Sequence, residues 1–423
     1  MKLLVLGSGG REHAISWKLA PEVSSLHVAP GNAGTAVLAR NAAIDPTDAD
    51  AVLAYVEKNA IDLTVVGPEL PLTRGIAERF MEAGRPIVGP TSRAAVIESS
   101  KAFAKEFFAR HRVPTARHRL AGSPAEAMAI LDRGEFGYPV VVKADGLAAG
   151  KGVVVAEDRE RACEAVQAMM VDRAYGSAGE RVVIEECLRG REASFFVLTD
   201  GTNVLPFHSA EDHKRVFDGD AGPNTGGMGA FSPSPAFDEA LEKRVLETIV
   251  RPVVDGLREE GREFRGFLYA GLMITAEGPK VLEFNARLGD PEAQAVLPLF
   301  DGELLPLLAQ VASGRLEERR CAFRDGAAVG VVLASRGYPE RPETGFVVNG
   351  LREASAFPDV LVFHAGTVLR GGHVVTAGGR VLTIVGLGRN HRSAMERAYE
   401  AASLVSFEGL HKRTDIGRKA IGG

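Results

Sequence analysis

The stretch VVVKADGLAAGKGVVV, residues 140–155, sets two valine-rich runs on either side of a loop with three glycines. Valine runs are typical of buried strands, and an ordinary hairpin needs only two to five residues between its strands. A longer loop with Gly146, Gly150 and Gly152, and with lysines at 143 and 151, favours a lid that closes over phosphates. An ordinary mobile hairpin is the alternative. The loop is not a Walker A motif, because Gly152 stands where that motif has a Ser or Thr for magnesium. ATP would therefore need a different binding architecture.

Composition narrows the class of protein. A chain of 423 residues suggests about three domains, and 45% hydrophobic residues supply an ample core. The net charge of −5 without a basic tract argues against nucleic acid as a partner. Three widely spaced cysteines argue against a disulfide framework and a zinc site, and favour a reducing cytosol. No apolar run approaches the roughly 18 residues of a membrane span, and the start of the chain does not look like a signal peptide. We expect a cytoplasmic protein that does not contact membranes.

The first hundred residues alternate between strand-like and helix-like runs, from LLVLG and REHAISWKLA to LTVVGP, LTRGIAERFMEAG and PIVGP. This pattern predicts a parallel sheet covered by helices, with ligands at the carboxyl ends of the strands. Those ends carry the turn-rich segments GSGGRE, APGNAGT, VGPELPL and VGPTS. They predict a binding crevice, with plain packing as the alternative.

The first of these turns, within LLVLGSGGREH at residues 3–13, resembles a dinucleotide fingerprint but departs from it. Gly7 and Gly9 fit G-x-G-x-x-G, whereas Glu12 takes the third glycine position. Ala29 and Pro30 stand where a ribose-binding acid is expected. The turn and a helix starting near Arg11 suit a single anion better than NAD. A plain strand-to-helix turn is the alternative.

The remaining chain has three further parts. Residues 99–114 read as a helix, and strands alternate with helices from about 115 to 190. Residues 218–235, DGDAGPNTGGMGAFSPSP, read as a long loop, and residues 238–261 as a helical run. From about residue 325 the chain has short strands at 328–335, 361–368 and 381–388 and one helix at 393–406.

The segment GLMITAEGPKVLEFNARLGDPEAQ, residues 271–294, predicts a hairpin whose second strand carries Glu283 and Asn285. Two residues apart on a strand, these side chains share a face, and Phe284 points to the other. Carboxylate and amide oxygens are suitable ligands for Mg²⁺, which also takes waters and phosphates. The pair is therefore a candidate metal site.

Two more segments carry clustered polar residues. The strand-like VVIEECLRGREAS, residues 182–194, ends in Glu185 and Glu186 and continues to Glu192. These carboxylates suit an adenine amino group or ribose hydroxyls, with exposed surface acids as the alternative. The segment 208–233 joins Asp212 and the HKR that follows it to a glycine-rich loop, which predicts backbone close to a small ligand. A surface turn is the alternative there.

In this order the motifs resemble the ATP-grasp superfamily and, within it, the phosphoribosylamine–glycine ligase family. The resemblance covers nearly the whole chain, through VLGSGGREHA, VVGPELPL, SSKAFAKEFF, KADGLAAGKG, EDHKRVFDGDAGPNTGGMGAFSP, VLEFNARLGDPEAQ and HKRTDIGRKAIG. It implies an α/β protein, α+β in its central part. An N-terminal parallel-sheet domain would span 1–103, an ATP-grasp domain 104–325 with a lid at 120–190, and a small β-rich domain 326–423.

The resemblance also implies an activity. Members ligate glycine to 5-phosphoribosylamine through glycyl phosphate, giving glycinamide ribonucleotide, ADP and phosphate in purine biosynthesis. The implied cofactors are ATP and Mg²⁺ or Mn²⁺, the partners are these small molecules alone, and a monomer is expected. Two alternatives from other classes stay open: a nicotinamide-dependent oxidoreductase using the first domain, and a non-catalytic nucleotide-binding module.

The implied roles fall on matching positions. ATP would contact Lys101, Lys143, the loop residues Gly146, Gly150, Lys151 and Gly152, the hinge residues Glu185, Glu186 and Leu188, and Glu192 at the ribose. Glu283 and Asn285 match the metal ligands, and Lys143, Asp212 and Arg287 the catalytic set. The two other substrates would contact Gly9, Gly10, Arg11, Glu12, Asn32, Gly34, Glu69, Asp212, Lys214, Asn224, Thr225, Gly226, Arg287, Gly289 and Asp290.

The sequence departs from the family pattern at two places. No carboxylate stands on the strand YAGLMIT that precedes the metal pair, so a second metal ion would need another ligand, with Glu292 as the candidate. Ala210 and Glu211 replace an expected serine–glutamine pair, outside the DHKR core.

Overall fold

Residues 1–100 form a five-stranded parallel sheet, as predicted. In the computed structural model, which describes residues 1–148 and 151–422, the strand order is β3-β2-β1-β4-β5. Alternate residues of β1 enter two different hydrophobic clusters, because Leu4 and Leu6 face one side and Leu3 and Val5 the other. The strands are β1 (Lys2–Gly7), β2 (Ser25–Pro30), β3 (Arg40–Asn41), β4 (Leu63–Val66) and β5 (Ile87–Val88), and the helices α1 (Gly10–Leu19), α2 (Thr35–Leu38), α3 (Ala49–Asn59), α4 (Glu69–Thr73), α5 (Ile76–Glu82) and α6 (Ser92–Ser99).

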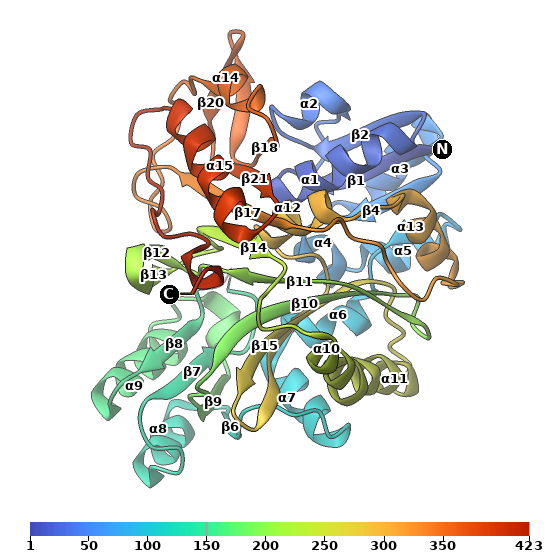
Figure 1. The fold of residues 1–423 in the computed structure, drawn as a ribbon. Coiled ribbons are helices and arrows are strands. Elements are labelled where there is room, and N and C mark those ends of the chain that lie inside the picture. The colour runs from blue at the N-terminus through green and yellow to red at the C-terminus, as the bar shows by residue number, and fades with distance from the viewer. Residues whose placement is uncertain (149–150, 423) are drawn as a thin grey trace.

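A separate lobe carries the lysine–glycine loop. After α7 (Lys101–Arg110), the chain forms a four-stranded sheet of order β6-β9-β7-β8, seen at the lower left of Figure 1 with α8 and α9 beside it. The strands of this lobe are β6 (His118–Ala121), β7 (Val140–Ala144), β8 (Val153–Ala156) and β9 (Val182–Glu186), and its helices are α8 (Pro124–Arg133) and α9 (Arg159–Val166). The two strands predicted at 140–155 are confirmed: β7 and β8 are antiparallel, with Lys143 opposite Val153. Gly150 lies outside the described residues.

The largest sheet has eight strands in the order β16-β15-β10-β11-β14-β17-β21-β18. They are β10 (Arg191–Thr199), β11 (Val204–Asp212), β14 (Gly229–Ser232), β15 (Gly266–Thr275), β16 (Gly278–Asn285), β17 (Ala327–Ala334), β18 (Val360–His364) and β21 (Arg380–Gly388). The predicted hairpin at 271–285 is confirmed as β15 and β16. Strands on both sides of residue 326 share this one sheet, because β14 pairs with β11 and with β17.

The prediction of a long loop at 218–235 is wrong. This stretch contains β14 and β13 (Ala221–Asn224), and β13 pairs with β12 (Arg215–Phe217). The pattern was invisible in the sequence because a four-residue, glycine-rich strand shows no periodicity and its partner β17 lies about a hundred residues further on. The strand predicted at 361–368 is likewise divided between β18 and β19 (Thr367–Arg370), which forms a hairpin with β20 (His373–Thr376).

Helices cover the large sheet. The helical run predicted at 238–261 consists of α10 (Glu239–Val245) and α11 (Arg251–Glu259), joined through the wider turn Leu246–Val250. The others are α12 (Glu292–Val296), α13 (Leu304–Ser313), α14 (Leu351–Ser355) and α15 (His391–Leu404). No helix among the described residues has the length and apolar character that crossing a membrane requires.

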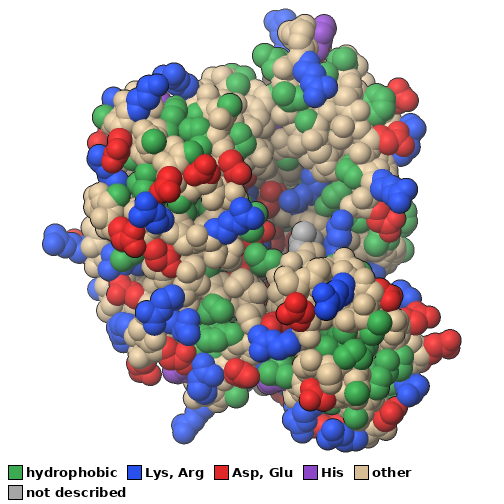
Figure 2. Space-filling view, turned by 180° about the vertical axis from the view of Figure 1, so that it is seen from behind, with side chains coloured by type: hydrophobic (Ala, Val, Ile, Leu, Met, Phe, Trp, Pro, Cys, Tyr) green, Lys and Arg blue, Asp and Glu red, His purple; other side chains and the backbone are tan. Residues whose placement is uncertain are grey.

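The molecule is hollowed between its lobes. Seen from behind in Figure 2, a deep hollow separates the lobe at the lower right, which holds α8 and α9, from the rest of the molecule. Basic and acidic side chains gather inside it. The β7–β8 loop and the end of β16 supply residues of the candidate active site.

Candidate active site

The base of the β7–β8 loop is tied to the start of α7. The carboxylate of Asp145 accepts hydrogen bonds from the backbone N–H of Ala102 (2.7 Å) and the hydroxyl of Ser100 (2.9 Å), and pairs with Arg181 (2.6 Å). Lys101 Nζ donates to the carbonyl of Gly146 (3.1 Å). The predicted phosphate lysine Lys101 and the predicted loop are thus neighbours, although they are 45 residues apart.

The second predicted phosphate lysine is buried against the hinge strand. Lys143 Nζ pairs with Glu185 and donates to the carbonyl of Leu282 (3.4 Å). The other oxygen of Glu185 pairs with Lys105 (2.6 Å). Lys105 was missed in the sequence, although it stands one helical turn after Lys101 on α7, which was an available signal.

The expectation that both hinge carboxylates are free for an adenine base is corrected. Glu185 is enclosed by Lys105 and Lys143, and Glu186 accepts from the backbone N–H (2.9 Å) and Nε (2.7 Å) of Arg117. A buried carboxylate recruits the nearest cations, which a strand pattern alone does not reveal.

Glu192, predicted at the ATP ribose, lies beside Asp212 and Lys214, which were predicted to contact substrate. Lys214 Nζ lies 2.8 Å from Glu192 Oε2 and 4.0 Å from Asp212 Oδ1. Burial raises the pKa of Asp212 to about 7; Lys214 opposes this rise, and Glu292 adds to it. Asp212 therefore titrates near neutrality.

Glu283 and Asn285 share one face of β16, opposite Gly271 and Tyr269 of β15, while Phe284 enters the core. Burial acts to raise the pKa of Glu283, but Lys214, Lys101 and other nearby cations hold it below its usual value. Glu283 is therefore ionised. An ionised carboxylate and an amide oxygen fit Mg²⁺, which takes few protein ligands when phosphates supply the rest.

No second metal ligand set is evident. A Cβ at Gly271 would lie only 3.2 Å from Glu283 Cγ, which accounts for the missing side chain on β15. Glu292 is buried, with Ser194 Oγ at 3.5 Å. Within residues 1–148 and 151–422, no group of three or more His, Cys, Asp or Glu is arranged to hold a metal ion.

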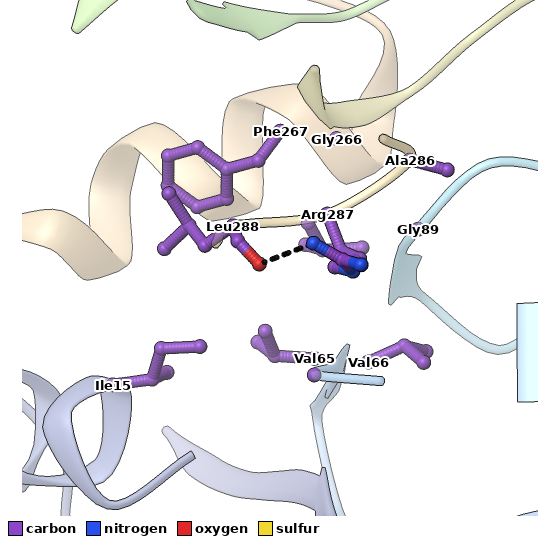
Figure 3. A pocket seen from close by; sticks show the side chains of 11 residues that line it. Ile15, Val65, Val66, Gly89, Gly266, Phe267, Ala286, Arg287 and Leu288 are labelled. Atoms are coloured by element: carbon purple, nitrogen blue, oxygen red, sulfur yellow. Dashed lines mark hydrogen bonds between the residues drawn. The ribbon is translucent and has the colours of Figure 1, made fainter. Parts of the chain in front are cut away.

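Arg287 joins the end of β16 to the N-terminal sheet. Its guanidinium pairs with Glu98 (2.8 Å) and Glu69 (3.2 Å) and donates to Asn285 Oδ1 (3.3 Å). Burial acts to raise the pKa of Glu69, but Arg287 and Arg11 lower it to about 2. Arg287 lines a small void together with apolar side chains such as Val65 and Phe267, and Figure 3 shows Val65 and Val66 below its guanidinium.

A side chain of α1 fills the first glycine turn. Glu12 accepts from the backbone N–H of Gly9 (2.6 Å) and from Arg11 Nε (2.6 Å). A Cβ at Gly7 would lie 2.5 Å from Glu12 Cγ, so glycine is required there. The expectation that Gly9 offers a free N–H to an anion is corrected: a carboxylate of the chain already neutralises the N-terminus of α1.

Replacing Glu12 with glutamine is expected to lower the free energy of unfolding by about 1–3 kcal/mol, because the buried hydrogen bonds from the Gly9 N–H and from Arg11 lose the carboxylate charge that strengthens them. Urea titrations followed by circular dichroism measure the change. Glu57→Gln, at an exposed position on α3, is the matched control and is expected to stay within about 0.5 kcal/mol of the wild type. Equal values for the two variants would contradict the capping role.

The remaining predicted substrate residues lie where loops of different regions meet. Asn32 Nδ2 donates to the carbonyls of Ser8 and His364 (both 2.8 Å). Asp290 pairs with Arg380 (3.2 Å), which also donates to the carbonyl of Gly226 (2.6 Å). Three predicted glycines lie against side chains: the position of a Cβ is filled by Gln294 at Gly10, by His13 at Gly34 and by Glu292 at Gly289. Gly152 lies near Ala148. Asn224 contacts Val153, Thr225 contacts Lys214, and Lys151 contacts Pro339.

Several residues of this region were missed in the sequence. Glu98 pairs with Arg287, Arg380 holds Asp290, and Tyr338 accepts from the backbone N–H of Gly226 (2.9 Å). The sequence around each of these residues shows no motif, because each one contacts a partner that lies about 90 to 190 residues away in the chain.

Three family models match the chain. They are described as the N domain (residues 1–98), the ATP-grasp (A) domain (residues 99–293) and the C domain (residues 328–419) of phosphoribosylglycinamide synthetase. A phosphoribosylamine–glycine ligase of Xylella fastidiosa is 50% identical, over 100% of this chain and 98% of that protein. One of Pseudomonas aeruginosa is 49% identical, with the same coverage.

Comparison with solved structures agrees with these family matches. A phosphoribosylamine–glycine ligase from Thermotoga maritima is 35% identical with a TM-score of 0.84, covering 98% of this chain and 100% of that one. Biotin carboxylase from Campylobacter jejuni, in complex with an ATP analogue, is 16% identical with a TM-score of 0.74, covering 97% and 92%. At that identity the second likeness concerns the fold alone. The predicted ATP-grasp architecture is confirmed by the family model of the ATP-grasp (A) domain.

Proposed function

The chain belongs to the phosphoribosylglycinamide synthetase family, and on that premise we propose that it ligates glycine to 5-phosphoribosylamine with cleavage of ATP to ADP and phosphate. The observation that carries this proposal is the meeting of Lys101 and Lys143 with Glu283. The two lysines come from α7 and β7, and both stabilise the ionised carboxylate on β16. Cations suited to phosphates and a carboxylate suited to a metal ion thus lie close together, which supports the proposal.

The first step would join the glycine carboxylate to the γ-phosphorus of ATP, with ADP leaving and glycyl phosphate forming. In phosphoryl transfer the protein mainly positions the reactants and neutralises charge. Lys101, Lys143 and the loop from Gly146 to Gly152 would hold the phosphates. Glu283 and Asn285 would hold Mg²⁺ or Mn²⁺, which neutralises phosphate charge when bound.

In the second step the amine of 5-phosphoribosylamine would attack the carbonyl carbon of glycyl phosphate, and phosphate would leave. Arg287, beside Asn285 and facing the N-terminal loops, would stabilise the negative charge of this step. Closure of the β7–β8 loop would exclude water, which otherwise hydrolyses the acyl phosphate.

The two substrates would occupy different sides of Arg287. Asp212 would offer a carboxylate to the glycine ammonium and Lys214 a cation to its carboxylate, while Glu192, which pairs with Lys214, would accept from the ribose hydroxyls of ATP. The acceptor would lie in the crevice between the N-terminal loops and residues 286–290, where Glu69 is partly exposed. Because Glu12 already engages Gly9, we do not assign the 5-phosphate to that N–H.

The test is ADP release by the purified chain with Mg²⁺, glycine and freshly formed 5-phosphoribosylamine. ADP is expected only when both substrates are present, with glycinamide ribonucleotide in equal amount by mass spectrometry. ADP release no faster than without either substrate would overturn the proposal and leave a nucleotide-binding module. The oxidoreductase alternative is not favoured, since the family is one of ligases.

The pH dependence should follow Asp212. Its pKa is raised to about 7, so the side chain is neutral below that pH and a carboxylate above it. Only the carboxylate attracts an ammonium group, so kcat/KM for glycine is expected to rise with pH and to level off above about 7. In Asp212→Asn this rise should vanish and KM for glycine should increase. The same pH profile in both proteins would remove Asp212 from the glycine site.

A further inference from the structure

Three charged side chains are buried together behind the cleft. Lys105, Glu185 and Lys143 have side-chain exposures of 3%, 2% and 9%. Lys105 Nζ lies 2.6 Å from one oxygen of Glu185, and Lys143 Nζ pairs with the other. A single carboxylate therefore lies between two ammonium groups.

This cluster links the two sheets that border the cleft. Lys105 Nζ also donates to Thr115 Oγ1 (2.7 Å), and that hydroxyl donates to the carbonyl of Val281 (2.7 Å). Lys143 donates to the next carbonyl of the same strand, that of Leu282. Glu185 and Lys143 belong to the lid sheet, whereas Val281 and Leu282 belong to β16 of the large sheet. The cluster thus holds the lid sheet against the strand that carries Glu283.

The cluster also carries unbalanced charge. Two ammonium groups and one carboxylate sum to +1 in a buried place, which is unfavourable unless an anion lies nearby. Burial acts to raise the pKa of Glu185, but Lys143 and Lys105 hold it below its usual value, so the carboxylate is ionised. Glu283, whose pKa Lys101 and Lys143 lower, takes up part of this excess positive charge, and the phosphates of a bound nucleotide would take up the rest.

We infer that Lys105 is a positioning residue for ATP: it engages Glu185 and so leaves the charge of Lys143 available to the ATP phosphates at a fixed place. The inference rests on the proposed function and adds a residue that is itself too buried to contact the nucleotide. Without Lys105, Glu185 and Lys143 form a neutral pair that attracts phosphate less.

The test compares wild type with Lys105→Met, which preserves length and removes the charge. Isothermal titration with Mg²⁺ and a non-hydrolysable ATP analogue, without the other substrates, is expected to show about tenfold or more weaker binding in the variant. KM for ATP should rise in parallel, whereas KM for glycine should stay within about twofold. Lys243→Met, at a 75% exposed lysine on α10, is the matched control and should bind like wild type.

The outcomes separate the two proposals. A wild-type chain that does not bind the analogue would overturn both, whereas equal binding by wild type and Lys105→Met would overturn this inference alone. Equal weakening for ATP and glycine, with a lower thermal midpoint, would show a merely structural role and also overturn it. If Lys105→Met does not fold, Lys105→Gln decides: it keeps a hydrogen-bond donor beside Glu185 and Thr115 but removes the charge, and unchanged analogue affinity in it would contradict the inference.

Discussion

Replacing Glu283 with glutamine is expected to reduce kcat for ADP release by about a thousandfold, because a metal ion supplies several kcal/mol of charge stabilisation in the transition state. The substitution keeps the shape of the side chain and removes the charge that four surrounding cations stabilise. The circular dichroism spectrum should stay that of the wild type, and the Mg²⁺ concentration for half-maximal activity should increase. The Ala variant should be equally inactive.

The matched control for this experiment lies on the same hairpin. Glu277 is 77% exposed at the β15–β16 turn and pairs only with Lys280 among the described residues. Glu277→Gln removes one carboxylate of the same type and is expected to leave turnover and Mg²⁺ dependence unchanged. Wild-type turnover in Glu283→Gln would remove Glu283 as a metal ligand.

Replacing Arg287 with methionine is expected to cost both stability and activity. The guanidinium is the partner of Glu98, whose side chain is only 4% exposed, and removing one partner of a buried pair typically costs about 3–5 kcal/mol. The free energy of unfolding from urea titration should fall by that amount, and ADP release should become undetectable.

A double variant separates the two effects. Arg287→Met combined with Glu98→Gln removes the uncompensated buried carboxylate, so most of the lost stability should return while activity stays absent. Arg79→Met is the control, because Arg79 is about half exposed in its pairs with Asp50 and Glu82, and such surface pairs contribute less than about 1 kcal/mol. Recovery of activity in the double variant would show that Arg287 has only a structural role.

The elements that were predicted correctly are those whose partners lie close by in the sequence. The alternation of strands and helices before residue 100 and the two hairpins at 140–155 and 271–285 are of this kind. Strand β14 was not predictable, since its four residues, three of them small, show no periodicity and pair with β17 from far along the chain.

The same distinction applies to the site. Glu283 and Asn285 were recognisable because alternation along one strand places both on one face. The hydrogen bond from Gly9 to Glu12 was not predicted, although the two residues are three apart, because the same glycine pattern is typical of turns that bind an external anion. The partners of Glu185 and Arg287 come from other regions of the chain.

The sequence by itself determined the ATP-grasp architecture, the family and the residue types that phosphate and metal chemistry require, because these depend on local order along the chain. Only the tertiary structure decided which charges remain available to ligands. Glu185 and Glu186 are committed to protein partners from other segments, whereas Glu283 lies near several cations but forms no ion pair among the described residues. The physical reason is that a buried charge takes the nearest opposite charge in space, and packing of distant segments sets that distance.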